Sequence, residues 1–337
     1  MSAPRPRHVF FLMFSIFLLL NLNYTILRSL RTTLAVVDLG AGAQSIPFFE
    51  LFGAMPGAVL MTWGIARLMN RYPIHKVFIL TMTAFLGFFM VFTFLLYPFL
   101  ADMQKSGDVG AAAVQVLVML FYVVAELWKP GLAIVLFWGL INQYLLVDEA
   151  KKLYAPLMLG GSLGAIVAGP LIGLCTSESF WMWFPVHAER WTHGLNLMVL
   201  FITVIGVIAG FLYYILWRCF DQYSQKYEAG AASDIYKGAI SFKNSLLACI
   251  ENKQLRLLSW IVIADYIAYS LGEVIFLDVL HIYLPNSSDY CAFMGNLSLW
   301  GGVLTFILSL FVTPMVLQHC RWVVAALVMP ICLLLIN

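Results

Sequence analysis

Hydrophobic and polar positions along this chain form long blocks. Apolar runs of about 20 residues or more are separated by shorter polar segments, and about 20 apolar residues in a helix cross the hydrocarbon core of a bilayer. Because the runs are long and continuous, a transmembrane barrel with short alternating strands is excluded. We expect nine helical spans, over residues 8–36, 46–66, 76–98, 112–146, 155–176, 194–217, 257–281, 291–317 and 322–337.

Two of these runs, 8–36 and 112–146, are longer than a straight crossing requires. We therefore expect both helices to tilt, kink or protrude from the membrane. Pro130 lies inside the second of them. Because proline has no backbone N–H to donate to the preceding turn, it predicts a kink at that point.

Composition supports a membrane protein. Hydrophobic residues make up 62% of the 337 residues, charged residues only 11%, and the mean hydropathy is +0.91. A soluble domain has about 25% charged residues. These values exclude a water-soluble enzyme and a disordered protein, and a net charge of +2 gives no basic surface for nucleic acid. The sequence predicts an all-α polytopic protein with the lipid bilayer as its partner.

The longest polar stretch, residues 218–256, holds ten of the 36 charged residues. It predicts a cytoplasmic loop between a six-helix bundle, residues 1–217, and a second bundle, residues 257–337. Two bundles around a central substrate site are typical of major-facilitator-type carriers, which have twelve spans. Because only about three spans follow the loop and the last run ends in apolar residues, we expect the second bundle to be incomplete and the chain truncated.

Lysine and arginine residues predict the orientation. With the N-terminus in the cytoplasm, 14 of the 19 basic residues lie on the inner side and two, Lys105 and Arg190, on the outer side. The other three lie within spans. Basic residues are enriched in cytoplasmic loops, so this asymmetry favours a cytoplasmic N-terminus.

Ionisable residues inside spans give the strongest functional signal, because each costs about 2.5–3.5 kcal/mol at a helix centre and tends to face the protein interior. Arg28 and Arg31 lie three residues apart on one helix. Two guanidinium groups at a cavity suit a polyanion such as a phosphate ester. The alternative is that they reach the interface or pair with an acid such as Glu50. Asn23 could lie on the same wall.

Three acidic residues also lie in spans. Glu126 either forms an internal ion pair or acts as a gating or coupling carboxylate. Asp265 and Glu273 are eight residues apart, which places them on one helix face. Glu273 is a candidate for proton coupling or for gating. We find no catalytic or metal-binding constellation, so the sequence predicts neither an enzyme nor a cofactor.

Four glycines of the fifth span occur near four-residue spacing: Gly160, Gly161, Gly164 and Gly169. No strand precedes them and no Lys-Ser/Thr follows them, as a phosphate-binding loop would require. They predict close helix packing.

The order of several short motifs resembles the ATP/ADP translocase family, also called nucleotide transport proteins, of obligate intracellular bacteria and plastids. The matching stretches are Asn23–Leu34, Ile46–Phe49, Ala125–Trp128, Leu136–Gln143, Glu149–Tyr154, Ser241–Lys243 and Glu273–Val274. The similarity runs over nearly the whole chain.

The resemblance implies roles for individual residues. The basic residue of the family's first helix corresponds to Arg31, and its functional glutamates to Glu126 and Glu273; Asn142 falls in a matching motif. The sequence departs from the family at Thr32, where Asp is common, and at Phe276 and Leu277, where Trp-Lys is common. These departures leave the fold intact but bear on which nucleotide is carried.

The resemblance implies a carrier of ATP, ADP or other nucleotides in a bacterial inner membrane, working by alternating access and most simply by ATP/ADP exchange. A proton-coupled importer of nucleotides or of another phosphorylated anion is a second hypothesis. A truncated remnant without transport activity is a third.

Overall fold

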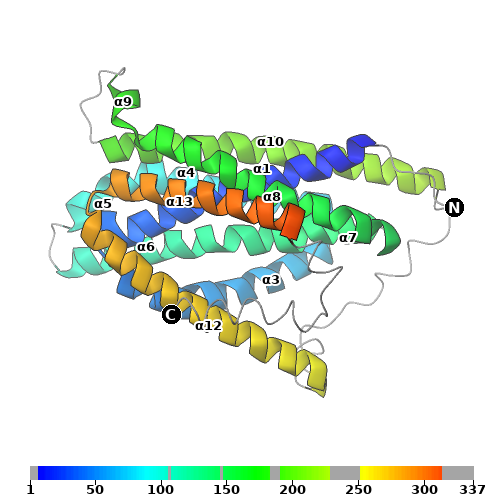
Figure 1. Cartoon of the computed structure of the whole chain (residues 1–337), viewed down its shortest axis with the longest axis horizontal. Helices are drawn as coiled ribbons and strands as arrows, with labels where there is room; N and C mark the ends of the chain where they lie inside the picture. The colour runs from blue at the N-terminus through cyan, green and yellow to red at the C-terminus, as the bar shows by residue number, and fades with distance from the viewer. Residues whose placement is uncertain (1–6, 105–107, 145–146, 183–189, 228–250, 313–337) are drawn as a thin grey trace.

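The computed structural model describes residues 7–104, 108–144, 147–182, 190–227 and 251–312, and within these ranges the chain contains helices and no strand (Figure 1). The long α-helices are α1 (Arg7–Thr33), α3 (Met55–Met69), α4 (Ile74–Val91), α6 (Asp108–Trp128), α8 (Val147–Thr176), α10 (Arg190–Tyr227), α12 (Lys253–Tyr283) and α13 (Ser287–Ile307). The shorter elements are η1 (Leu34–Asp38), η2 (Ala43–Ser45), α2 (Ile46–Phe49), η3 (Glu50–Ala54), η4 (Phe92–Leu96), α5 (Tyr97–Gln104), η5 (Lys129–Phe137), α7 (Trp138–Tyr144), α9 (Glu178–Trp181) and η6 (Leu308–Val312).

Seven helical stretches in the described part are long and apolar enough to cross a membrane: His8–Asp38, Ala43–Met69, Ile74–Leu100, Ala112–Gln143, Pro156–Thr176, Arg190–Asp221 and Ser287–Phe311. They correspond to seven of the nine predicted spans. The predicted span 257–281 lies within α12, a helix of 31 residues that is not among these seven. The predicted span 322–337 lies outside the described residues. The chain is thus an all-α, multi-pass membrane protein.

The polar stretch predicted as a loop, residues 218–256, is helical at both ends. Helix α10 continues to Tyr227 and α12 begins at Lys253. Lysine, arginine and glutamine are good helix formers in water, so a helix need not stop where its apolar residues stop. Residues 228–250 of the predicted loop lie outside the described part.

The expected distortion at Pro130 is present. Helix α6 changes at Lys129 into η5, a π-helical segment of nine residues that leads into α7. A wider turn accommodates the proline, which has no N–H to donate. The helix thus departs from regular α-helical geometry at the predicted proline, and the kink itself stays a prediction.

Helix α1 lies at the centre of the bundle and packs against α6, α8, α10 and α13 (Figure 1). Its buried side chains, from Met13 to Leu30, are almost fully enclosed. The indole Nε1 of Trp128, on α6, donates a hydrogen bond to the Leu20 carbonyl oxygen at 3.1 Å. This central position places the polar residues of α1 at the heart of the molecule.

Helix α8 contacts α1 and α13 through glycines. A Cβ added at Gly164 would lie 2.7 Å from the Leu18 carbonyl oxygen of α1. One added at Gly169 would lie 2.7 Å from the Gly295 carbonyl oxygen of α13. The helix backbones therefore approach each other directly, and the predicted packing role of the glycines in this span is confirmed.

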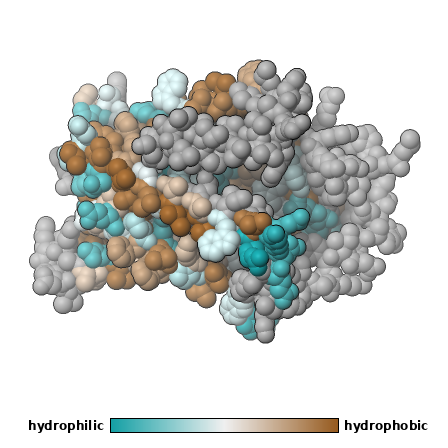
Figure 2. All heavy atoms as spheres, turned by 60° about the horizontal axis from the view of Figure 1, so that its bottom comes forward, coloured by the Kyte–Doolittle hydropathy of each residue, from teal (hydrophilic) through white to brown (hydrophobic). Residues whose placement is uncertain are grey.

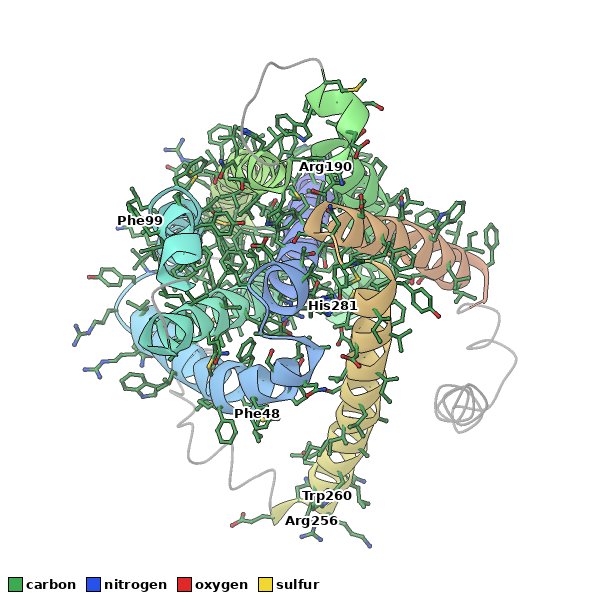
Figure 3. All side chains as sticks on the ribbon, turned by 90° about the vertical axis from the view of Figure 1, so that its left-hand side faces the viewer. Phe48, Phe99, Arg190, Arg256, Trp260 and His281 are labelled. Carbon is green, nitrogen blue, oxygen red and sulfur yellow. The ribbon has the colours of Figure 1, made fainter. Side chains whose placement is uncertain are left out.

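Helix α12 diverges from the bundle. Figure 3 shows its Arg256 and Trp260 end far from the other helices, whereas its His281 end lies close to them. Large apolar side chains along α12 are exposed, among them Ile263, Ile267 and Ile275, and Figure 2 shows apolar side chains over much of this face. The described side-chain contacts of α12 with α1 are made by Tyr269 and Glu273, in the C-terminal half of α12.

Candidate functional site

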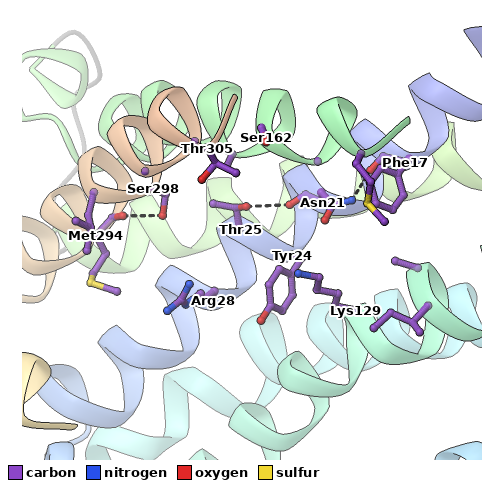
Figure 4. Close-up of a pocket in the computed structure, with 18 of the residues that line it drawn as sticks. Phe17, Asn21, Tyr24, Thr25, Arg28, Lys129, Ser162, Met294, Ser298 and Thr305 are labelled. Atoms are coloured by element: carbon purple, nitrogen blue, oxygen red, sulfur yellow. Dashed lines mark hydrogen bonds between the residues drawn. The ribbon is translucent and has the colours of Figure 1, made fainter. Parts of the chain in front are cut away.

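A cavity of about 700 Å³ lies beside α1, between η5, α7, α8 and α13 (Figure 4). Its polar lining residues are Asn21, Tyr24, Thr25, Arg28, Lys129, Ser162, Ser298 and Thr305. Two of these carry positive charge, and none of the lining residues is acidic. Small-molecule pockets occupy about 300–1,000 Å³. The cavity therefore has the size for a nucleotide and the charge for an anion.

Arg28 lines this cavity and also joins α1 to α12. Its guanidinium Nη2 donates to the Tyr269 hydroxyl at 2.5 Å and to Glu273 Oε1 at 2.8 Å. The Arg28 side chain is 36% exposed and that of Glu273 13%. Because Tyr269 and Glu273 are four residues apart, they lie one helical turn apart on the same face of α12. Sequence reasoning named Arg28 and Glu273 but did not pair them.

Arg31 takes a different direction and does not line the cavity. Its side chain is 4% exposed, forms an ion pair with Glu126 of α6, and lies over the Tyr122 ring with 4.4 Å between its guanidinium carbon and the ring centroid. Three residues of an α-helix advance by about 300°, so side chains at i and i+3 diverge by about 60°. The two arginines, predicted to share one site, thus face α12 and α6 respectively.

The two ion pairs share a sequence spacing. Tyr122 precedes Glu126 by four residues, as Tyr269 precedes Glu273. In each pair the tyrosine contacts the arginine that binds the glutamate. The repeated Tyr-x-x-x-Glu spacing is the signal in the sequence from which both tyrosines could have been predicted as site residues.

Glu50 connects the neighbourhoods of the two ion pairs. The Tyr122 hydroxyl donates to Glu50 Oε1 at 3.3 Å, and the Ser270 hydroxyl of α12 donates to Glu50 Oε2 at 3.0 Å. Glu50 was considered as a partner for Arg28 or Arg31. In the structure its hydrogen-bond partners are hydroxyl groups, so it forms a second polar link between α12 and the rest of the bundle.

Lys129 is the second basic residue of the cavity. It begins η5, and its ammonium nitrogen lies 4.9 Å from the centroid of the Tyr24 ring. Within the part of the chain that the structure describes, it has no carboxylate at salt-bridge distance. Sequence reasoning counted it among the basic residues inside spans but did not include it in the site.

The two asparagines named from the sequence lie elsewhere. Asn23 is fully buried, and its Nδ2 donates to the Ile202 carbonyl oxygen of α10 at 3.0 Å. Asn142 Oδ1 accepts a hydrogen bond from the Tyr154 hydroxyl. Neither lines the cavity, so in this conformation both amides connect helices. Asp265 lies on α12, and its side chain falls outside the described part.

Polar contacts join α13 and other helices at one end of the bundle, which we call the Asp38 end. Asp38 accepts hydrogen bonds from the Tyr97 hydroxyl at 2.9 Å and from the Ser287 hydroxyl of α13 at 3.3 Å. Arg190 of α10 donates to Asp289 of α13 at 2.7 Å and also pairs with Glu178 (Figure 3 labels Arg190). These contacts close one end of the interface that flanks the cavity.

The model of the family described as TLC ATP/ADP transporter matches residues 7–337. The chain belongs to this family. It is 30% identical to ADP,ATP carrier protein 1 of Chlamydia trachomatis over 337 residues, which is 96% of this chain and 63% of the relative. It is also 30% identical to ADP,ATP carrier protein 2, chloroplastic, of Arabidopsis thaliana, over 93% of this chain and 52% of the relative.

The chain thus spans between about half and two thirds of the length of these TLC-family relatives. No solved structure matches it. The resemblance to ATP/ADP translocases is confirmed at the level of the family. Among the described residues of this member, no group of three or more His, Cys, Asp or Glu side chains comes together as a metal site.

Proposed function

We propose that this protein is a membrane carrier, not an enzyme, and that it exchanges ATP for ADP. The observation that supports this most strongly is the position of Arg28. It faces a nucleotide-sized cavity without acidic lining residues, and it also holds Glu273 of α12 at 2.8 Å. Membership in the TLC ATP/ADP transporter family makes nucleotides the expected anions.

The geometry suggests how substrate binding is coupled to movement. A nucleotide phosphate and the Glu273 carboxylate are both anions that bind a guanidinium group. When phosphate takes the place of the carboxylate at Arg28, it removes one link between α1 and α12. The helices up to α10 can then rock more freely against α12, as alternating access requires.

The same ion pair accounts for exchange rather than one-way transport. Without substrate, Arg28 and Glu273 neutralise each other and hold α1 against α12. Breaking this pair with no replacement anion leaves both charges without a partner, which costs up to about 1 kcal/mol because the Arg28 side chain is 36% exposed. The empty carrier therefore returns slowly, whereas a bound nucleotide satisfies Arg28 throughout.

We further propose that the N-terminus lies in the cytoplasm and that the Asp38 end faces the outside, in a bacterial inner membrane. The 14 to 2 distribution of basic residues supports this orientation. The cavity is then closed toward the outside by the contacts of Asp38 and Arg190. Its lining residues on α1, from Phe17 to Arg28, lie in the middle of the helical stretch His8–Asp38.

The test is uptake of labelled ATP by proteoliposomes that contain this chain. We expect rapid uptake into vesicles preloaded with ADP and little uptake into empty ones. Uptake that needs no internal nucleotide and is abolished by a proton uncoupler would replace exchange with proton-coupled import. No uptake and no nucleotide binding by inserted protein would contradict the proposal.

A further inference from the structure

Unlike Arg28 and Arg31, Lys129 has no carboxylate within salt-bridge distance among the residues that the structure describes. Arg28 is paired with Glu273, and Arg31 with Glu126. Lys129 lies over the face of the Tyr24 ring at 4.9 Å, and the carboxylate of Glu126, one helical turn before it, is held by Arg31. A charged group inside a membrane protein normally faces a partner or a ligand. The Lys129 ammonium group instead lines the cavity, where an anionic ligand can reach it.

The energetics favour an anion at this position. A lysine ammonium group at a helix centre is costly in a membrane, and a cation–π contact offsets only part of that cost. Tyr24 therefore compensates the charge only in part. A phosphate oxygen would compensate it better than the ring does, because hydrogen bonds between ionised groups are about twice as strong as neutral ones.

Basic residues and aromatic residues line different parts of the cavity. Tyr24 and Arg28 are four residues apart on α1 and share one face, and Lys129 approaches Tyr24 from η5 (Figure 4). Arg28 and Lys129 thus lie on either side of the Tyr24 ring. Beyond them, toward the start of α1, the lining is aromatic, with Phe17 and Trp138. The cavity has a cationic part and an aromatic part.

We propose that Lys129 binds the nucleotide's phosphate chain and selects for its charge, and that Tyr24 holds the ammonium group when the cavity is empty. The inference rests on the proposed function and adds a binding residue to it. With Arg28, Lys129 gives two cations for the phosphate chain, so the site favours di- and triphosphates over monophosphates. The nucleoside then lies toward Phe17 and Trp138.

The experiment measures binding to the purified full chain, with ATP, ADP, AMP, adenosine and inorganic tripolyphosphate as probes. Lys129→Gln removes the charge and keeps most of the length. Lys129→Arg restores the charge, which separates loss of charge from loss of folding. Lys76→Gln is the matched control, because Lys76 is exposed on α4 and does not line the cavity.

We expect Lys129→Gln to weaken ATP and tripolyphosphate binding about tenfold or more, as loss of a charge-assisted hydrogen bond does. AMP binding should weaken less, and adenosine binding less than twofold. Lys129→Arg should recover most of the affinity, and Lys76→Gln should leave it unchanged. Equal losses for ATP and adenosine, or wild-type ATP affinity in Lys129→Gln, would overturn the inference.

The two proposals fail in different ways. If the wild-type protein binds ATP and Lys129→Gln binds it equally well, the role of Lys129 is wrong and the proposed function stands. If the wild-type protein binds tripolyphosphate through Lys129 but shows no preference for nucleotides, the cationic site is supported and nucleotide transport is wrong. If the wild-type protein binds none of the probes, both proposals are overturned.

Discussion

Arg28 and Glu273 are 245 positions apart in the sequence, yet they form a hydrogen-bonded ion pair of 2.8 Å between α1 and α12. Tyr269, one helical turn before Glu273, hydrogen-bonds to the same guanidinium nitrogen. The pair lies at the edge of the cavity, so it connects the site that would bind substrate with the contact that would have to open.

Glu273→Gln should therefore increase nucleotide affinity. The substitution keeps the shape of the side chain and removes the anion that competes for Arg28. Because the Arg28 side chain is 36% exposed, the pair contributes up to about 1 kcal/mol, which corresponds to a change of about two- to fivefold in the Kd for ATP. Uptake into empty vesicles should rise at the same time.

Binding of labelled ATP to purified wild-type and Glu273→Gln protein measures this effect. Asp278→Asn on the same helix is a control for removing one negative charge from α12. If Glu273→Gln bound ATP more weakly than the wild type did, Glu273 would contribute to substrate binding and would not compete with substrate.

Arg31→Gln should act on stability. Arg31 is 4% exposed and Glu126 27%, so removing Arg31 leaves the partly buried Glu126 carboxylate without its ion-pair partner. Breaking a buried ion pair costs about 3–5 kcal/mol. We expect a clear drop in the Tm of the purified protein, and a partial recovery in the double variant Arg31→Gln/Glu126→Gln, in which no charge remains. A Tm equal to that of the wild type would mean that the pair does not stabilise this state.

Arg190→Gln should open the Asp38 end. Arg190 bridges Glu178 and Asp289, and both carboxylates are largely exposed, so the loss is at most about 1 kcal/mol. That is enough to change the population of an open state about fivefold. A Ser298→Cys reporter in a background without other cysteines should then react faster with a membrane-impermeant maleimide added outside.

The matched control for this prediction is Arg67→Gln, which removes an exposed arginine near the C-terminal end of α3. Its labelling rate should equal that of the reporter alone. If Arg190→Gln also labelled at the unmodified rate, the contacts at the Asp38 end would not determine access to the cavity.

Gly169→Ala should weaken the contact between α8 and α13. Its new Cβ would lie 2.6 Å from Leu299 Cβ and 2.7 Å from the Gly295 carbonyl oxygen, so the two backbones must separate. Overpacking of this kind costs about 1–3 kcal/mol. Gly173→Ala is the control on the same helix, because nothing lies within 4 Å of a Cβ there. Thermal unfolding should show a lower Tm for the first variant and an unchanged or higher one for the second.

The sequence predicted the helices well because membrane spans need long apolar runs, and these are visible without knowledge of contacts. It predicted Pro130 as a point of distortion for a local reason, the missing N–H. The helical ends of the segment 218–256 were missed, because polarity marks where a helix leaves the membrane and not where it ends.

The site was less predictable because it depends on how helices are rotated about their axes. Glu126 and Glu273 were recognised as carboxylates in spans. Which of them pairs with Arg28 and which with Arg31 depends on the 60° between the two arginines around α1 and on where α6 and α12 lie, and the sequence of one helix does not show this. Asn23 occurs in the same motif as both arginines but faces α10. Lys129 enters the cavity only because η5 brings it to Tyr24.

The backbone contacts of Gly164 and Gly169 with α1 and α13 affect the kinetics of any rocking movement. Where side chains interlock, two helices change their crossing angle only if rotamers rearrange, which adds to the activation barrier. At a glycine crossing there are fewer side chains to rearrange, so the contact between α8 and α13 adds little to the activation barrier. In the proposed exchange cycle, the main barrier is then set by two polar contacts, Arg28 with Glu273 and Arg190 with Asp289, and its height depends on what binds Arg28.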